Sequence, residues 1–192
     1  MAYYPKTFSG RRASQSDFEL SSLIQLLKDK GVKRYLEVGA RDGDTFHEIM
    51  SNLPTGSLGV ALDLPGGLWG RTTSQIKLVL ACENLNTLGY SVKCVFGDSS
   101  DKSVVDKIQN MAPFDAILID GDHTYEGVKT DYENYKDLAP IIIFHDIVGT
   151  GNVENIHNRK VEVPVLWNEI KDETSIEYID PECTMGIGIK FI

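Results

Sequence analysis

The residues 36–45, which read LEVGARDGDT, decide the fold of this 192-residue chain. They begin in a short apolar strand that starts near Tyr35 and lead into a helix that starts near Thr45. Between the two, Gly39 and Gly43 permit a tight turn and let a ligand approach the backbone closely. A strand, a glycine turn and a helix in this order favour a sheet protein of the α/β class.

The same alternation continues along the chain. Runs that are apolar throughout are typical of parallel strands covered on both faces. They occupy 58–64, 91–96, 114–119 and 141–144, with helical patterns between them, and two further strands follow at 175–179 and 186–192. No clear helix separates this last pair. We therefore expect a doubly wound, mostly parallel seven-stranded α/β sheet with an antiparallel C-terminal hairpin.

We expect one domain over 1–192, with an irregular segment at 1–15. A capping box of Ser16 and Glu19 then predicts the start of the first helix, and Gly31 a stop after it.

Composition limits the class of partner. The chain has 19 Lys and Arg against 28 Asp and Glu, a formal net charge of −9. Such a charge disfavours nucleic acid and anionic membranes as partners. No apolar run approaches the roughly 18 residues of a membrane span, and the first residues lack a signal-peptide core. The scattered cysteines Cys82, Cys94 and Cys183 indicate reduced, buried thiols, so we expect a cytoplasmic protein. A homo-oligomer is left open.

Polar residues follow each of the five predicted parallel strands. In such sheets ligands bind outside the carboxyl ends of the strands. In chain order these ends carry Glu37 with Gly39 and Gly43, then Asp63, then Asp98 with Ser99, then 120–123 (DGDH), then His145 with Asp146. Five polar ends on one edge of a sheet predict a single ligand site that runs along it.

The second strand indicates a nucleoside. Asp63 lies 20 residues after Gly43, and an acid there can accept hydrogen bonds from both ribose hydroxyls. The turn lacks the GxGxxG spacing of a diphosphate cradle. Asp42 and Asp44 would repel a diphosphate at a helix start that should attract one. S-adenosylmethionine (SAM), a nucleoside without phosphates, fits better than NAD or ATP.

The stretch 36–45 resembles the first motif of the class I SAM-dependent methyltransferases. Asp63 corresponds to the acid that holds the ribose in that family, and 97–99 (GDS) resembles the segment that recognises adenine. The stretches 119–127 (IDGDHTYEG) and 144–146 (FHD) resemble a branch related to macrocin O-methyltransferases and cephalosporin hydroxylase-like proteins. The resemblance covers about 33–148. Arg41 stands where the family often has glycine.

The resemblance implies two sets of site residues. The cofactor would be bound by Glu37, Gly39, Arg41, Gly43, Thr45, Asp63, Leu64, Asp98, Ser99 and Asp120. A divalent metal, magnesium or another, would be held by Asp120, His145 and Asp146, and would lower the pKa of an acceptor hydroxyl. Without a metal, His145 and Asp146 would have structural roles.

His123 is a candidate general base, because its ordinary pKa lets it take a proton at neutral pH. Asp120 is the other candidate catalytic residue. Alternatively, His123 caps the following helix or orients Asp120.

Roles are also expected for several residues outside these two sets. Trp69 either lines the adenosine pocket or packs, and Tyr3 and Tyr4 belong either to a lid or to a frayed terminus. Surface or packing roles are expected for His47 and His157. A solvated helix face is expected for Glu126, Asp131, Glu133 and Asp137.

These patterns predict a SAM-dependent methyltransferase that acts on the hydroxyl of a small molecule, such as a sugar or a diol. Two alternatives remain at this stage. One is a nicotinamide-dependent oxidoreductase on a Rossmann-type sheet, and the other is a nucleoside-binding module without catalysis.

Overall fold

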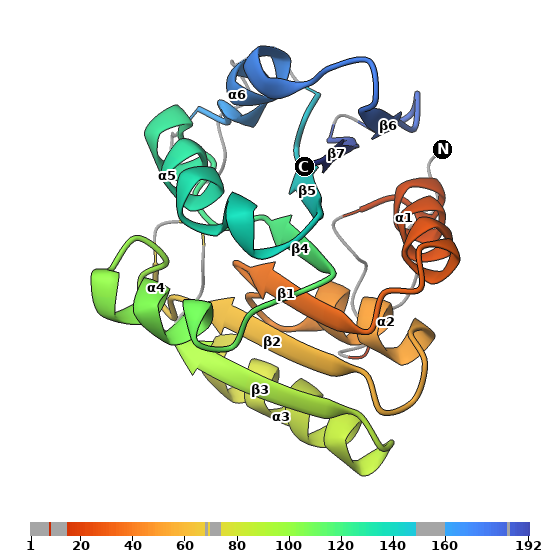
Figure 1. Ribbon diagram of the computed structural model, residues 1–192, viewed down its shortest axis with the longest axis vertical. Helices are drawn as coiled ribbons and strands as arrows, with labels where there is room; N and C mark the ends of the chain where they lie inside the picture. The colour runs from red at the N-terminus through yellow and green to blue at the C-terminus, as the bar shows by residue number, and fades with distance from the viewer. Residues whose placement is uncertain (1–7, 9–14, 68, 70–73, 149–159, 184) are drawn as a thin grey trace.

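The structure is a computed structural model that describes residues 8, 15–67, 69, 74–148, 160–183 and 185–192. Seven strands form one sheet in the order β3-β2-β1-β4-β5-β7-β6 (Figure 1). The strands are β1 (Arg34–Val38), β2 (Leu58–Asp63), β3 (Ser91–Phe96), β4 (Ala116–Ile119), β5 (Ile141–His145), β6 (Ile176–Tyr178) and β7 (Ile187–Phe191). Strands β1 to β5 pair in parallel, and β7 runs antiparallel to both β5 and β6. The predicted fold class is confirmed.

Helices cover both faces of the sheet (Figure 1). They are α1 (Asp17–Asp29), α2 (Asp44–Asn52), α3 (Ser74–Thr87), α4 (Lys102–Gln109), α5 (Tyr125–Tyr135) and α6 (Val163–Ile170), with a 3₁₀ turn η1 (Lys136–Leu138). Side chains of α1, α2 and α3 pack in one apolar core with Tyr35 of β1. Side chains of α4, α5 and α6 pack in a second core with Leu36 and Val38. Successive residues of β1 therefore face opposite layers, as the pleat requires.

The central strands and the edge strand differ in burial. Every residue of β4 and β5 is buried, as a doubly covered parallel strand requires. Strand β3 alternates between exposed and buried residues over its first three positions. It has this pattern because it lies at the edge of the sheet, where one face is only partly covered.

The first helix begins as predicted. Ser16 Oγ accepts a hydrogen bond from the Glu19 amide at 3.2 Å, and the Ser16 amide donates to Glu19 Oε2 at 3.1 Å. The other oxygen of Glu19 accepts from the Gly186 amide at 3.1 Å. One side chain thus caps α1 and also ties it to the segment that enters β7, a second role without a local sequence signal.

One prediction on α5 is wrong. Glu126, Glu133 and Asp137 are exposed, but Asp131 is only 1% exposed. Asp131 lies three residues after Val128 and one before Tyr132, both of which face the core. Helical spacing therefore turns it inward.

Several weaker expectations concern packing. His47 Nε2 lies 2.8 Å from Asn84 Oδ1, which links α2 to α3 as a packing residue would. Cys82 and Cys183 are buried, and Cys94 is half-buried. Tyr3, Tyr4 and His157 lie outside the described residues. Among the helices that the structure describes, none is long and apolar enough to cross a membrane.

Removing the cap of α1 should measurably lower stability. We expect Ser16→Ala to reduce the free energy of unfolding by about 1 kcal/mol, because the Glu19 amide loses its acceptor. Urea denaturation followed by circular dichroism measures the change. Ser21→Ala, at an exposed position of the same helix, is the matched control, and an equal effect of both variants would contradict the prediction.

Candidate functional site

The turn after β1 is closely packed against the end of β4. Gly39 has a φ of +89°, and a Cβ added to it would lie 2.2 Å from the carbonyl oxygen of Asp120. The amides of Gly39 and Ala40 both donate to the carbonyl oxygen of Leu62, at 2.8 and 3.0 Å. Only glycine fits here. The turn is thereby held against β2 on one side and β4 on the other.

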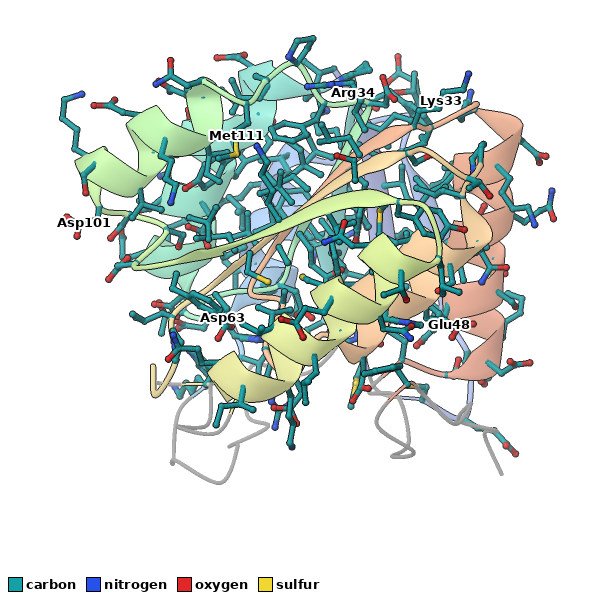
Figure 2. All side chains as sticks on the ribbon, turned by 90° about the horizontal axis from the view of Figure 1, so that it is seen from below. Lys33, Arg34, Glu48, Asp63, Asp101 and Met111 are labelled. Carbon is teal, nitrogen blue, oxygen red and sulfur yellow. The ribbon has the colours of Figure 1, made fainter. Side chains whose placement is uncertain are left out.

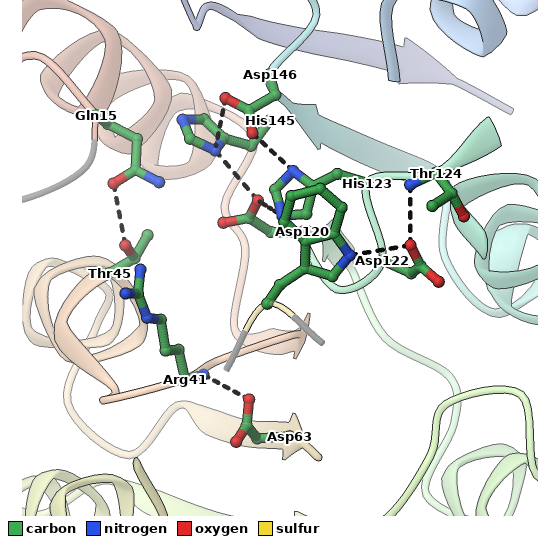
Figure 3. Close-up of polar contacts among 11 residues, drawn as sticks. Gln15, Arg41, Thr45, Asp63, Asp120, Asp122, His123, Thr124, His145 and Asp146 are labelled. Atoms are coloured by element: carbon green, nitrogen blue, oxygen red, sulfur yellow. Dashed lines mark hydrogen bonds and ion pairs between the residues drawn. The ribbon is translucent and has the colours of Figure 1, made fainter. Parts of the chain in front are cut away.

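One carboxyl oxygen of Asp63, at the end of β2, accepts a hydrogen bond, and the other is buried. Its Oδ1 accepts a hydrogen bond from the Arg41 amide at 2.9 Å (Figure 3). Its Oδ2 is buried and has no hydrogen-bond partner among the residues that the structure describes. Arg41 itself has a φ of 48°, in the left-handed region. Burial raises the pKa of Asp63, against the effect of the Arg41 amide. The turn orients this carboxyl and leaves its second oxygen for a ligand.

The acids of the turn are not both open to solvent. Asp42 Oδ2 lies 2.7 Å from Lys77 Nζ of α3, and the residue is buried. This ion pair weakens the repulsion that Asp42 was expected to exert on a diphosphate. Thr45 Oγ1 donates to Gln15 Oε1 at 3.0 Å, so the hydroxyl of Thr45 contacts the segment before α1.

Glu37 is a buried acid in the middle of the sheet. It is 2% exposed, and its Oε2 accepts a hydrogen bond from the Tyr35 hydroxyl at 2.8 Å. Burial raises the pKa of Glu37 to about 8, although the bond from Tyr35 opposes this shift. Its carboxyl is therefore largely protonated at neutral pH.

The loop after β3 folds around its own polar groups. Asp98 Oδ1 accepts from the amide and the hydroxyl of Ser100, at 2.8 and 2.6 Å. The carbonyl oxygen of Ser99 accepts from the Tyr135 hydroxyl at 2.7 Å. On the neighbouring strand end, Leu64 is 44% exposed, which is unusual for a large apolar side chain beside polar loops.

Two carboxylates and two imidazoles meet where β4 and β5 end (Figure 3). His145 Nδ1 lies 3.1 Å from Asp120 Oδ1 and 3.6 Å from Asp146 Oδ1. His123 Nδ1 lies 2.7 Å from Asp146 Oδ2, and its Nε2 lies 3.8 Å from Asp120 Oδ1. All four predicted residues are thus brought together.

One subset of this cluster suits a metal ion best. Ligand atoms of Asp120, His123 and Asp146 lie within 4.8 Å of one another. His123 Nδ1 is buried and makes no hydrogen bond of good geometry, although the Asp146 carboxylate is close. Two carboxylates with one imidazole suit a divalent cation such as magnesium or manganese. His145, which the sequence placed in this set, lies deeper, at 4% exposure.

The carboxylates and imidazoles of the cluster shift one another's pKa values. Burial alone would lower the pKa of His145, but the carboxylates of Asp146 and Asp120 raise it to about 10. The pKa of His123 is raised by the same two carboxylates against its burial. Burial would raise the pKa of Asp146, yet His145 and His123 lower it to about 2. The imidazolium of His145 therefore offsets part of the charge of the two carboxylates.

Trp69 reaches this cluster from the loop after β2. Its Nε1 donates to Asp122 Oδ1 at 3.1 Å, and its ring centroid lies 4.6 Å from that of His123. Trp69 therefore lines the histidine end of the site. Lys77, Asp131 and Tyr135 also contact site residues, but each lies within a helix, and no motif marked them.

The sheet order and the antiparallel β7 define the fold of the class I SAM-dependent methyltransferases. No family model matches the sequence, and none of the curated proteins matches it. Solved structures of the same fold do match.

One is an O-methyltransferase from Bacillus cereus in complex with SAH, with a TM-score of 0.68 and 18% identity over 93% of this chain and 82% of that one. Another is TomG from Streptomyces achromogenes, an O-methyltransferase involved in tomaymycin synthesis and solved with SAM. Its TM-score is 0.70 at 15% identity, over 96% of this chain and 84% of that one. A third is cofactor-bound Rv0187 from MTB, with a TM-score of 0.71 at 15% identity over 95% and 83%.

The raised pKa of Glu37 predicts a pH-dependent cost to folding. Between pH 4.5, its ordinary pKa, and about 8, the folded state holds a proton that the unfolded state releases. Stability from this group is therefore fully present below pH 4.5 and is lost as the pH rises through 8. Glu37→Gln does not titrate, so its free energy of unfolding should exceed that of the unmodified protein by an amount that grows from pH 5 to 9, on the order of a few kcal/mol.

Urea denaturation of ligand-free protein at several pH values measures this difference. Glu126→Gln removes an exposed carboxyl of the same kind and should follow the unmodified protein. A constant offset between Glu37→Gln and the unmodified protein across this range would refute the prediction.

Proposed function

We propose that this protein is a SAM-dependent methyltransferase that methylates a hydroxyl oxygen of a small molecule. The observation that carries the proposal is Asp63, whose Oδ1 is oriented by the Arg41 amide while its Oδ2 is buried and lacks a partner within the described part of the chain. A ribose hydroxyl would donate a hydrogen bond to this Oδ2 atom. The fold shared with SAM- and SAH-bound O-methyltransferases supports the same ligand.

The order of the strands predicts how the nucleoside is oriented in the site. Its ribose lies at the end of β2, beside Asp63. The Asp120 cluster, at the ends of β4 and β5, is the only described group of polar residues with acids and histidines arranged for proton or metal chemistry. The methyl group should therefore point toward β4, and the base toward β3 on the other side of the ribose.

Catalysis would come mainly from holding the acceptor oxygen in line with the methyl carbon and the sulfur. Asp120 and His123 lie where the acceptor hydroxyl must lose its proton. His123 serves as general base only when its own proton has left, and the neighbouring carboxylates raise its pKa. Loss of the acceptor proton therefore depends on what else neutralises Asp120 and Asp146.

A divalent cation would perform that neutralisation. Asp120, His123 and Asp146 would hold it, with His145 close behind. When bound, such a cation lowers the pKa of a coordinated hydroxyl. We propose magnesium as the first candidate, because two of the three donors are carboxylates.

The acceptor class follows from charge and from the resemblance. A net charge of −9 disfavours nucleic acid. Sugars or diols offer neighbouring hydroxyls that suit both a metal and a base. A cytoplasmic location, a homo-oligomer and the macrocin O-methyltransferase-like branch remain predictions from the sequence.

Loss of the Asp63 carboxylate should abolish tight nucleoside binding. We expect Asp63→Ala to weaken binding of S-adenosylhomocysteine at least tenfold in titration calorimetry, because the ribose loses its charged acceptor. Asp115→Ala is the matched control, since Asp115 accepts from the amides of Lys33 and Arg34. Figure 2 shows Lys33 and Arg34 at the end of the sheet opposite Asp63.

The same titration separates the alternatives. Binding of NAD but not of S-adenosylhomocysteine would replace the proposal with the oxidoreductase. Unchanged affinity in Asp63→Ala would remove its central observation. Tight binding of S-adenosylhomocysteine without methylation of any sugar or catechol tested would favour the nucleoside-binding module.

The proposed metal site leads to a separate prediction. We expect methyl transfer to fall at least tenfold after treatment with EDTA and to return on addition of magnesium. Asp146→Asn should weaken the magnesium response, because one anionic donor is lost, while binding of S-adenosylhomocysteine changes little. Activity that is indifferent to EDTA and to Asp146→Asn would assign the cluster to proton transfer alone.

A further inference from the structure

Helix α5 places two polar side chains, one turn apart, against the loop that follows β3. Burial raises the pKa of Asp131 to about 7, and polar groups of the Ser99 side chain and the Asp122 backbone oppose this shift. The hydroxyl of Tyr135 donates to the Ser99 carbonyl oxygen at 2.7 Å. Ser99 therefore lies against the same helix at both its side chain and its backbone.

Asp131 also determines the position of the loop that follows β4. A Cβ on Gly121 would lie 3.0 Å from Asp131 Oδ2, so this loop packs directly on the carboxyl. Asp131 packs on the loop after β4 and Tyr135 bonds to the loop after β3, so one helix face connects the two loops. These two strands are not neighbours in the sheet, since β2 and β1 lie between them.

Burial of the Asp131 carboxyl costs free energy of folding. Asp131 is 1% exposed, and its Oδ2 has no hydrogen-bond partner in the described ranges. The charges of Asp122 and Asp98 lie close enough to oppose its ionisation. A leucine on the same face of α5 would avoid that penalty. The described contacts of Asp131 all lead to the two loops, so its contribution is their relative placement.

Those two loops border the place of the base. In the proposed nucleoside site, the ribose lies at the end of β2 and the methyl group points toward β4, so the purine extends toward β3. It would then lie between the loop carrying Ser99 and the loop carrying Asp122.

We propose that Asp131 and Tyr135 are positioning residues for the purine base, and that they set the distance between the loops after β3 and β4. The inference rests on the proposed nucleoside site. Neither side chain touches the ligand, because both act through Ser99 and the Asp122 backbone.

Substitution of Asp131 tests the inference by titration calorimetry with two probes, S-adenosylhomocysteine and adenosine. We expect Asp131→Leu to weaken both about tenfold, because both carry the base, and Tyr135→Phe to weaken both by about threefold. Asp131→Asn retains an acceptor oxygen and should restore affinity to within about twofold. In methyl-transfer assays the KM for SAM should rise in Asp131→Leu while kcat stays within about twofold.

Asp115→Leu is the matched control. It also removes a carboxyl that accepts two hydrogen bonds between segments, from the Lys33 and Arg34 amides, but at the opposite end of the sheet. It should lower the melting temperature without changing either affinity. If Asp131→Leu fails to fold, Tyr135→Phe and Asp131→Asn still give the comparison.

The outcomes are distinct. Affinities in Asp131→Leu and Tyr135→Phe within twofold of the unmodified protein would overturn the inference and leave the proposed function intact. An equal loss in Asp115→Leu would also overturn it, since the effect would then be general destabilisation. Failure of the unmodified protein to bind S-adenosylhomocysteine would overturn both proposals.

Discussion

The close approach of β1 to β4 is the constraint on which the site depends. At Gly39 the backbone comes so near the carbonyl of Asp120 that no side chain fits. This contact places the first turn against the end of β4 and the carbonyl of Leu62 in β2. As a result Arg41 can orient Asp63, and Asp120 is held beside the turn.

Charge at the other end of the site is balanced locally. Asp120 and Asp146 face His145 and His123, and the carboxylates raise the pKa of both imidazoles, that of His145 to about 10. The overall acidity of the chain does not describe this region, where each carboxylate has a cationic neighbour.

The strand-end acids were predictable because parallel strands bring their carboxyl ends to one edge of the sheet. Asp63, Asp120, His123 and Asp146 could therefore be listed from local patterns alone. The arrangement of the imidazoles was not predictable, since His123 follows β4 and His145 ends β5, and their side-chain directions depend on packing. The charge pattern of α5 predicts an exposed Asp131, whereas its place beside Val128 and Tyr132 turns this side chain toward the core. The partner of Asp42, Lys77, lies on α3 and had no motif.

The sequence by itself determined the order of strands and helices, the cap of α1 and the glycine turn. These follow from periodicity and backbone stereochemistry, which act over a few neighbouring residues. Only the tertiary structure decided which oxygens remain without partners, which imidazole faces which carboxylate, and that one face of α5 connects two distant loops. Those properties depend on distances between segments far apart in the chain, and packing alone sets such distances.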